Sequence, residues 1–391
     1  MILIGFPKAE VDPVVLEEVK LGKAGSIILF EKNVPAKNSY HELEKMIWTY
    51  KKAAPIPLLV AIDQEGGKVN RLKEKYSLPR SVTAAAMGKD ASLDSVRFYG
   101  ASIASTLSGL GININFAPVV DLASNPYNPI IAKVERAFSA NEDTVYLMAR
   151  EYIKEHHKRQ VLTVLKHFPG HGSSKDDTHL GLADVTATWE KRELVPYQKL
   201  INEQYVDAVM TAHIVNKNLD DRGLPGTLSD RMINQLLRND LGFDGVVFSD
   251  DMQMHAITKH YGFEEAIKLA ILAGVDILCF SNNIQGSDLR TVDRVHSIIK
   301  NYVSQGVISQ HRIDESFKRI LELKKRHSQT QEEIYRLELV KIKKQGVELE
   351  RRAREEVEQA IKKAEQLNEE KNQDESSSKK SKTKKKKKEN N

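Results

Sequence analysis

The sequence has few of the features that mark secreted or membrane-embedded proteins. Cys279 is the single cysteine among 391 residues, so no disulfide can form within the chain and no oxidising compartment is indicated. Met1 is followed directly by Ile2-Leu3-Ile4-Gly5-Phe6, without a basic segment or a long apolar stretch. We therefore expect neither a signal peptide nor membrane insertion, and we predict a cytoplasmic protein.

A charge excess of one sign is confined to the C-terminal end. The formal net charge is +5, but residues 371–391 contain nine lysines and three acids, so the positive excess belongs to this segment. The remaining chain is close to neutral and gives no indication of a nucleic-acid-binding domain. We predict that residues 371–391 form a disordered, solvated tail, whose partner stays unknown.

Charged residues with a helical pattern precede this tail and predict a helical extension over residues 326–370. Within it, apolar residues recur in steps of four and three: Ala353, Val357, Ala360, Ala364 and Leu367. This spacing is a short heptad seam. A solvated helix is favoured over a dimerising coiled coil.

Apolar runs rich in β-branched residues alternate with amphipathic helical patterns up to about residue 325. This alternation predicts βα units around a parallel sheet. Nearly all residues in the runs are apolar, as expected when both faces of a strand are covered. The predicted strands are Ile2–Phe6, Ser26–Phe30, Leu58–Ile62, Ile112–Ala117, Leu162–Lys166, Ala208–Ala212, Val246–Ser249 and Ile277–Phe280.

About eight such units in roughly 320 residues predict a (β/α)8 TIM barrel, an α/β fold, as a single catalytic domain over residues 1–325. A doubly wound open sheet is the alternative architecture. That architecture commonly carries a Gly-x-Gly-x-x-Gly phosphate-binding turn, which follows none of the predicted strands. The barrel is therefore favoured.

Polar side chains follow the apolar run at six of the predicted strands. Because the carboxyl ends of barrel strands build the active site, we expect these side chains to converge at one mouth. For any one of them, an acid that caps the following helix is an equally good explanation. The residues are Asp63, Asp121, Lys166 with His167, His213, Asp250 with Asp251, and Asn282 with Asn283.

The third of these strand ends opens into a loop with a distinctive composition, Lys166-His167-Phe168-Pro169-Gly170-His171-Gly172. Further along, Asp177 stands two residues before His179, where a carboxylate can hydrogen-bond an imidazole and raise its basicity. The loop is therefore predicted to carry a proton donor. Two alternatives are a metal site formed by His167, His171, Asp177 and His179, and a turn in which the acid caps backbone amides.

Five motifs in order along the chain carry a resemblance to a known family. They are Ala61-Ile62-Asp63-Gln64-Glu65-Gly66-Gly67 through Arg71, Asn115-Phe116-Ala117-Pro118-Val119-Val120-Asp121, Glu135-Arg136-Ala137-Phe138, the loop of residues 166–172 with Asp177-Thr178-His179, and Leu241-Gly242-Phe243-Asp244-Gly245-Val246-Val247-Phe248-Ser249-Asp250-Asp251-Met252. The chain resembles glycoside hydrolase family 3, and within it the bacterial β-N-acetylglucosaminidases of cell-wall recycling. The matching stretches lie between about Ser26 and Asn283.

The resemblance implies roles for particular residues. Asp250 matches the family's catalytic nucleophile, His179 its general acid/base and Asp177 the carboxylate that supports the histidine. Five further residues match sugar-binding positions: Asp63, Arg71, Arg136, Lys166 and His167. The implied activity is retaining hydrolysis of terminal β-linked N-acetylglucosamine, from a carbohydrate substrate such as a peptidoglycan-derived muropeptide, with no metal and no cofactor.

Three other functions remain open from the sequence. A phosphorylase is one, because a neutral histidine base repels phosphate less than a carboxylate would. Another family 3 β-hexosidase, such as a β-glucosidase, is the second. A sugar-binding or scaffold protein acting through its helix and tail is the third. It is disfavoured because the full set of chemical residues is present.

Overall fold

The computed structural model of the chain describes residues 1–89, 92–176, 181–284, 291–326, 344–349, 351–352, 355–356 and 359. The chain divides into two compact units, Met1–Ile334 and Tyr335–Asn391. In the second unit, residues 344–349 are helical. The predicted seam from Ala353 to Leu367 and the tail of residues 371–391 lie outside the described residues.

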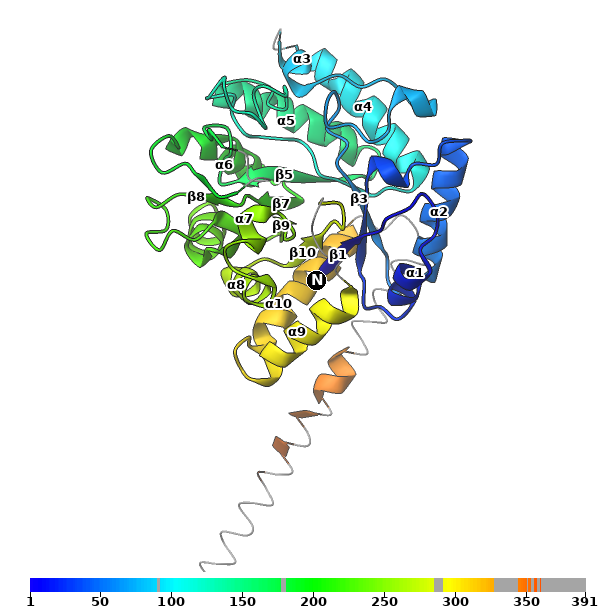
Figure 1. Cartoon of the computed structure of the whole chain (residues 1–391), viewed down its shortest axis with the longest axis vertical. Coiled ribbons are helices and arrows are strands. Elements are labelled where there is room, and N and C mark those ends of the chain that lie inside the picture. The colour runs from blue at the N-terminus through cyan, green and yellow to red at the C-terminus, as the bar shows by residue number, and fades with distance from the viewer. Residues whose placement is uncertain are drawn as a thin grey trace, which may run out of the picture. The chain divides into compact units, whose positions relative to one another are not determined.

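The first unit is a closed barrel of parallel strands surrounded by helices (Figure 1). Around the barrel the order is β1-β10-β9-β7-β5-β4-β3-β2, and each neighbouring pair is parallel. The strands are β1 (Ile2–Gly5), β2 (Ser26–Leu29), β3 (Leu59–Ile62), β4 (Ile114–Asn115), β5 (Leu162–Phe168), β7 (Ala208–Thr211), β9 (Val246–Asp251) and β10 (Ile277–Phe280).

The barrel architecture predicted from the sequence is confirmed. Each of the eight predicted runs overlaps one barrel strand, and the open-sheet alternative is wrong because β1 pairs with both β2 and β10. A separate two-stranded parallel pair, β6 (Ala183–Asp184) and β8 (Ile214–Val215), was not predicted. Strands of two residues carry too short an apolar pattern to be recognised.

Helices connect and surround the strands. The α-helices are α1 (Pro13–Lys20), α2 (Ser39–Ala53), α3 (Ala84–Gly88), α4 (Leu93–Leu110), α5 (Glu142–His157), α6 (Val195–Asn202), α7 (His255–Thr258), α8 (Phe263–Ala273), α9 (Val292–Ser304) and α10 (Gln310–Arg326). Short 3-10 turns are η1 (Glu31–Asn33), η2 (Glu74–Tyr76), η3 (Lys191–Leu194) and η4 (Gly226–Leu228), and η5 (Arg231–Asp240) is a helix of π type.

Two apolar cores explain why the strands are apolar on both faces. The outer core lies between the barrel and its helices, where the α2 residues Leu43, Met46 and Ile47 are buried. The inner core fills the barrel with side chains from alternate strand positions, and the rings of Phe116 and Phe248 meet edge to face at 5.4 Å there. Burial on both faces leaves only the strand ends free to carry polar chemistry.

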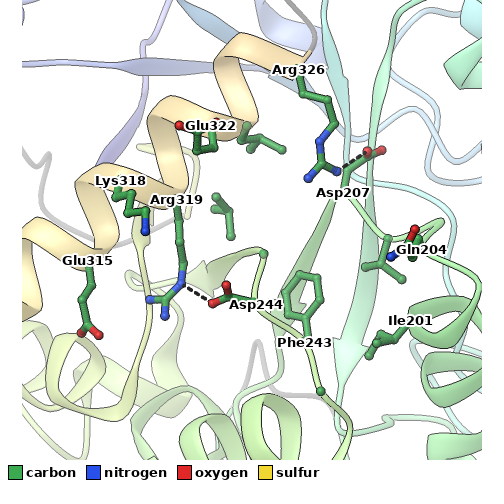
Figure 2. Close-up of a pocket in the computed structure, with 15 residues that line it drawn as sticks. Ile201, Gln204, Asp207, Phe243, Asp244, Glu315, Lys318, Arg319, Glu322 and Arg326 are labelled. Carbon is green, nitrogen blue, oxygen red and sulfur yellow. Dashed lines mark hydrogen bonds and ion pairs between the residues drawn. The ribbon is translucent and has the colours of Figure 1, made fainter. Parts of the chain in front are cut away.

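Helix α10 lies across the amino ends of the strands. Its Ile320 and Leu323 belong to the inner core, and they close the barrel on this side. Figure 2 shows Arg319 and Arg326 of α10 reaching across a cavity of about 780 Å³. They approach two acids that precede strands, with 3.3 Å from Arg319 Nε to Asp244 Oδ1 and 3.9 Å from Arg326 Nη1 to Asp207 Oδ1.

A buried lysine holds the same helix in place. The Lys324 Nζ donates hydrogen bonds to the carbonyl oxygens of Gly25, at 2.7 Å, and of Pro57, at 2.5 Å, just before β2 and β3. Only 3% of Lys324 is exposed, and burial lowers the pKa of its amine to about 7. The folded protein therefore favours a neutral lysine where the unfolded chain carries a charged one.

This difference predicts a pH-dependent stability. Between pH 7 and the ordinary lysine pKa, the unfolded chain binds the proton that the folded chain has lost, so folding becomes more favourable as the pH rises. We expect the unfolding free energy of the wild type, measured in urea relative to Lys324→Met, to rise by at most about 1.4 kcal/mol per pH unit from pH 7 to 9. Lys325→Met, at an exposed neighbour, is the control: it keeps Lys324, so the wild type measured relative to this variant should show no such slope. Parallel curves for the wild type and Lys324→Met would contradict the prediction.

Candidate active site

A cavity of about 360 Å³ opens at the carboxyl ends of the barrel strands. It is smaller than the cavity beneath α10, but it lies at the end of the strands where (β/α)8-barrel proteins carry their catalytic residues. Its lining includes Phe30, Asp63, Arg71, Phe116, Ile130, Arg136, Lys166, His167, His171, Met210, Asp250, Asp251, Met254 and Ser281.

One wall of the cavity is a buried network of charges built on Glu65. Its carboxylate forms a bidentate pair with Arg136, at 2.8 Å from Nε and 2.7 Å from Nη2, and also accepts from Lys166 Nζ at 2.6 Å. Lys166 Nζ is in turn 2.7 Å from Asp63 Oδ1. Burial alone would raise the pKa of Glu65, but the cations of Arg136 and Lys166 outweigh burial and lower it. Glu65 is therefore the counter-ion that fixes two cations at the cavity.

The network predicts a large stability loss for Glu65→Gln. The substitution keeps the shape but removes the charge, and it leaves the buried Arg136 and Lys166 without full compensation. We expect urea unfolding at pH 7 to show a loss of about 3–5 kcal/mol. Glu31→Gln is the matched control, because Glu31 also binds two cations but at a partly exposed site, where less than about 1 kcal/mol is expected. Equal losses in the two variants would contradict this account of the network.

A second buried acid, Asp121, orders the loop after β5. The His167 Nδ1 lies 2.6 Å from Asp121 Oδ2, and the backbone N–H groups of His167 and His171 donate to the Asp121 carboxylate as well. The Arg136 Nη2 is 3.1 Å from His167 Nε2. Because arginine can only donate, the geometry assigns the proton of a neutral His167 to Nδ1 and leaves Nε2 as an acceptor.

Two adjacent carboxylates at the end of β9 have different surroundings. Asp251 is buried, and its carboxylate accepts from the backbone N–H groups of Gln253 and Ser281 and from the Ser281 hydroxyl. Burial raises the pKa of Asp251 to about 6. Asp250 is only half-buried and lines the cavity, where its Oδ1 accepts from the Asp251 N–H at 2.8 Å. Asp250 is thus the more exposed of the two carboxylates at the cavity.

The sequence-predicted site residues are brought together in part. Asp63, Arg71, Arg136, Lys166, His167 and Asp250 all line the one cavity. Asp177 and His179 lie outside the described residues, so their placement stays a prediction. The described part of their loop ends at Asp176 and resumes at Gly181.

Not every polar strand end reaches the cavity, contrary to the expectation of convergence. His213 is buried in structural hydrogen bonds, from Nδ1 to Thr227 Oγ1 at 2.8 Å and from Nε2 to the Asp251 carbonyl at 2.9 Å. The Asn282 side chain donates to the Gly5 carbonyl and joins neighbouring strand ends. Strand-end position alone could not separate these structural groups from those that face the cavity.

Sequence reasoning considered His171 only as a ligand of the alternative metal site and gave Glu65 no role, yet the structure places both at the site. His171 lines the cavity, and burial, together with the nearby His167, lowers the pKa of His171 to about 4, so its imidazole is neutral near pH 7. Glu65 was recognisable only as part of a motif, although its spacing of two from Asp63 places both on the same side of an extended chain. Among the described residues, no group of three or more His, Cys, Asp or Glu side chains is arranged to hold a metal ion.

The barrel and its polar cavity define the chain as a (β/α)8-barrel enzyme. Residues 4–323 match the Glycosyl hydrolase family 3 N terminal domain. The chain belongs to this family, and it is a glycosidase. No helix among the described residues is both long enough and apolar enough to cross a membrane.

Relatives and solved structures agree with this assignment. The chain is 32% identical over 292 residues to a beta-hexosaminidase of Tolumonas auensis, which covers 73% of this chain and 84% of that protein. It is 36% identical over 285 residues to a beta-hexosaminidase of Xylella fastidiosa strain M23, covering 71% and 82%. A glycoside hydrolase family 3 beta-N-acetylglucosaminidase from Paenibacillus sp. superposes with a TM-score of 0.76 at 32% identity, over 87% of this chain and 66% of that one.

Proposed function

We propose that the chain is a retaining β-N-acetylhexosaminidase that removes terminal β-linked N-acetylglucosamine, with Asp250 as nucleophile and His179 as general acid/base. The observation that carries this proposal is the placement of the half-buried Asp250 carboxylate in one cavity with Asp63, Arg71 and Lys166. A carboxylate that lines the cavity at a strand end, beside donors and acceptors suited to hydroxyl groups, fits nucleophilic attack on a sugar. The similarity to beta-hexosaminidases and to a beta-N-acetylglucosaminidase supports the hexosamine specificity.

The reaction would proceed in two displacements. In the first, an Asp250 oxygen attacks the anomeric carbon while the imidazolium of His179 gives its proton to the departing oxygen. The sugar is then held as an ester on Asp250. In the second, neutral His179 takes a proton from water, the water oxygen attacks the anomeric carbon, and the Asp250 carboxylate is released. Asp177 would stabilise the imidazolium form of His179 between the two steps.

The charged groups of the cavity would hold the sugar ring. Lys166 uses two of its three N–H donors on Asp63 and Glu65, which leaves one for a hydroxyl group. The buried Nε of Arg71 has no hydrogen-bond partner among the described residues, so this guanidinium has donors to offer. Arg136 is largely occupied by Glu65, the Ile130 carbonyl and His167, and would mainly orient its neighbours. Such contacts let binding energy assist ring distortion.

The natural substrate is proposed on the strength of the resemblance described above. It would be N-acetylglucosamine linked to an N-acetylmuramic or anhydromuramic unit, as in muropeptides from peptidoglycan turnover. A cytoplasmic location remains a prediction from the sequence.

Product analysis tests the proposed function. The purified protein is mixed with an aryl β-N-acetylglucosaminide, and the first sugar released is followed by proton NMR before mutarotation. We expect the β anomer, and an α anomer would exclude the retaining mechanism. Formation of a sugar 1-phosphate in phosphate buffer would identify a phosphorylase. Faster cleavage of the matched aryl β-glucoside would identify a β-glucosidase.

A further inference from the structure

The loop of residues 169–173, which precedes His179 in the chain, is held by side chains that do not line the cavity. The Asn128 Nδ2 donates to the carbonyl oxygens of His171, at 2.8 Å, and Gly172, at 3.0 Å. The Trp189 Nε1 donates to the Pro169 carbonyl at 3.1 Å. The loop therefore has two faces, one that presents side chains to the cavity and one that rests on buried polar groups.

Glu193, on the 3-10 turn η3, is the buried acid on this second face. Its Oε2 accepts from the Gly172 N–H at 3.1 Å, and only 1% of the residue is exposed. A Cβ added at Gly170 would stand 2.5 Å from the same Oε2 and 2.7 Å from the Glu193 Cβ. The glycine at position 170, with φ +122°, thus lets the loop backbone lie directly on this carboxyl group.

The neutral form of Glu193 suits a residue that only binds the loop backbone. Burial, together with the nearby carboxylate of Asp121, raises the pKa of Glu193 to about 7. From α6, the phenol of Tyr197 also faces this acid. At pH 6 the group is therefore mostly neutral, so it holds the backbone without placing a second negative charge beside Asp121.

We propose that Glu193 is a positioning residue of the glycosidase reaction, which fixes the Gly170–Ser173 backbone and thereby places the segment that carries His179. This inference rests on the proposed function, because it gives Glu193 importance only if His179 donates the proton. Glu193 does not line the cavity and would act through the loop alone.

The test uses substrates that differ in their need for an acid. A dinitrophenyl β-N-acetylglucosaminide leaves readily without a proton, whereas the phenyl glycoside requires one. At pH 6 we expect Glu193→Ala to lower kcat/KM for the phenyl glycoside by about 30-fold or more, a sizeable part of the usual 10²–10⁴-fold value of acid catalysis. The dinitrophenyl substrate should lose less than about fivefold. Glu193→Gln, which keeps the acceptor for the Gly172 N–H and stays neutral, should restore both rates to within about threefold.

Further variants keep the outcome decisive. Glu193→Asp shortens the reach to Gly172. It should lower kcat/KM for the phenyl glycoside more than for the dinitrophenyl glycoside, by a smaller factor than Glu193→Ala does. This variant tests the proposal if the alanine variant does not fold. Glu18→Ala is the control, because Glu18 on α1 is another buried acid whose pKa burial raises but which lies outside the cavity. Equal losses with both substrates, or no loss with either, would overturn the proposal. A wild type that fails to cleave either glycoside would instead sink the proposed function.

Discussion

Asp250→Asn is expected to abolish turnover of every glycoside that the wild type cleaves, with kcat reduced on the order of 10⁴-fold or more. The amide is isosteric with the carboxylate but cannot form the glycosyl ester. The loss of the nucleophile therefore cannot be made up by a better leaving group or by protonation of the leaving oxygen. The loss should be the same for phenyl and dinitrophenyl substrates. Initial-rate assays across this pair measure it directly, and circular dichroism verifies that the barrel remains folded.

The neighbouring Asp251→Asn is the matched control for this prediction. Asp251 is buried and hydrogen-bonded to Gln253 and Ser281, so its replacement should act on the stability of the β9 and β10 ends. We expect it to retain measurable activity, with any loss traceable to a lower unfolding temperature. A fluorinated glycosyl donor should trap a covalent sugar on Asp250. A trapped sugar on another side chain, or an active Asp250→Asn, would remove the assigned nucleophile.

The arrangement of the barrel could be predicted because its physical causes are local in the sequence. Strands buried on both faces must be apolar throughout, so the runs around Val60 and Val247 were distinguishable from amphipathic helices. Parallel strands bring their carboxyl ends to the same mouth, so Asp63, Lys166 and Asp250 could be placed together from the sequence alone.

Other features depend on contacts between distant residues and left no local pattern. Lys324 belongs to a strongly basic helix end, and such residues usually extend into solvent. Its burial becomes evident only when the carbonyl groups of Gly25 and Pro57, 299 and 267 positions earlier, are seen to accept from it. The hydrogen bond from the Gly172 N–H to Glu193 likewise left no local pattern, because the two residues lie 21 positions apart with β6 between them.

His179→Ala is expected to lower kcat/KM for the phenyl glycoside by about 10²–10⁴-fold, while the dinitrophenyl glycoside loses far less in its first, bond-breaking step. A phenolate is a poor leaving group and needs the proton, whereas dinitrophenolate departs unaided. The difference between the two substrates therefore isolates proton donation from binding and folding. Pre-steady-state bursts of dinitrophenolate would measure the first step separately from the release of the sugar.

His171→Gln provides the comparison within the same loop. Because burial lowers the pKa of His171 to about 4, its imidazole is neutral at pH 6 and cannot serve as the imidazolium acid, so its replacement should affect both substrates alike. Sensitivity to the leaving group should thus follow His179 and not His171. If the pattern were reversed, the donor would be the histidine that lines the cavity, and the role of the Asp177-Thr178-His179 segment would have to be abandoned.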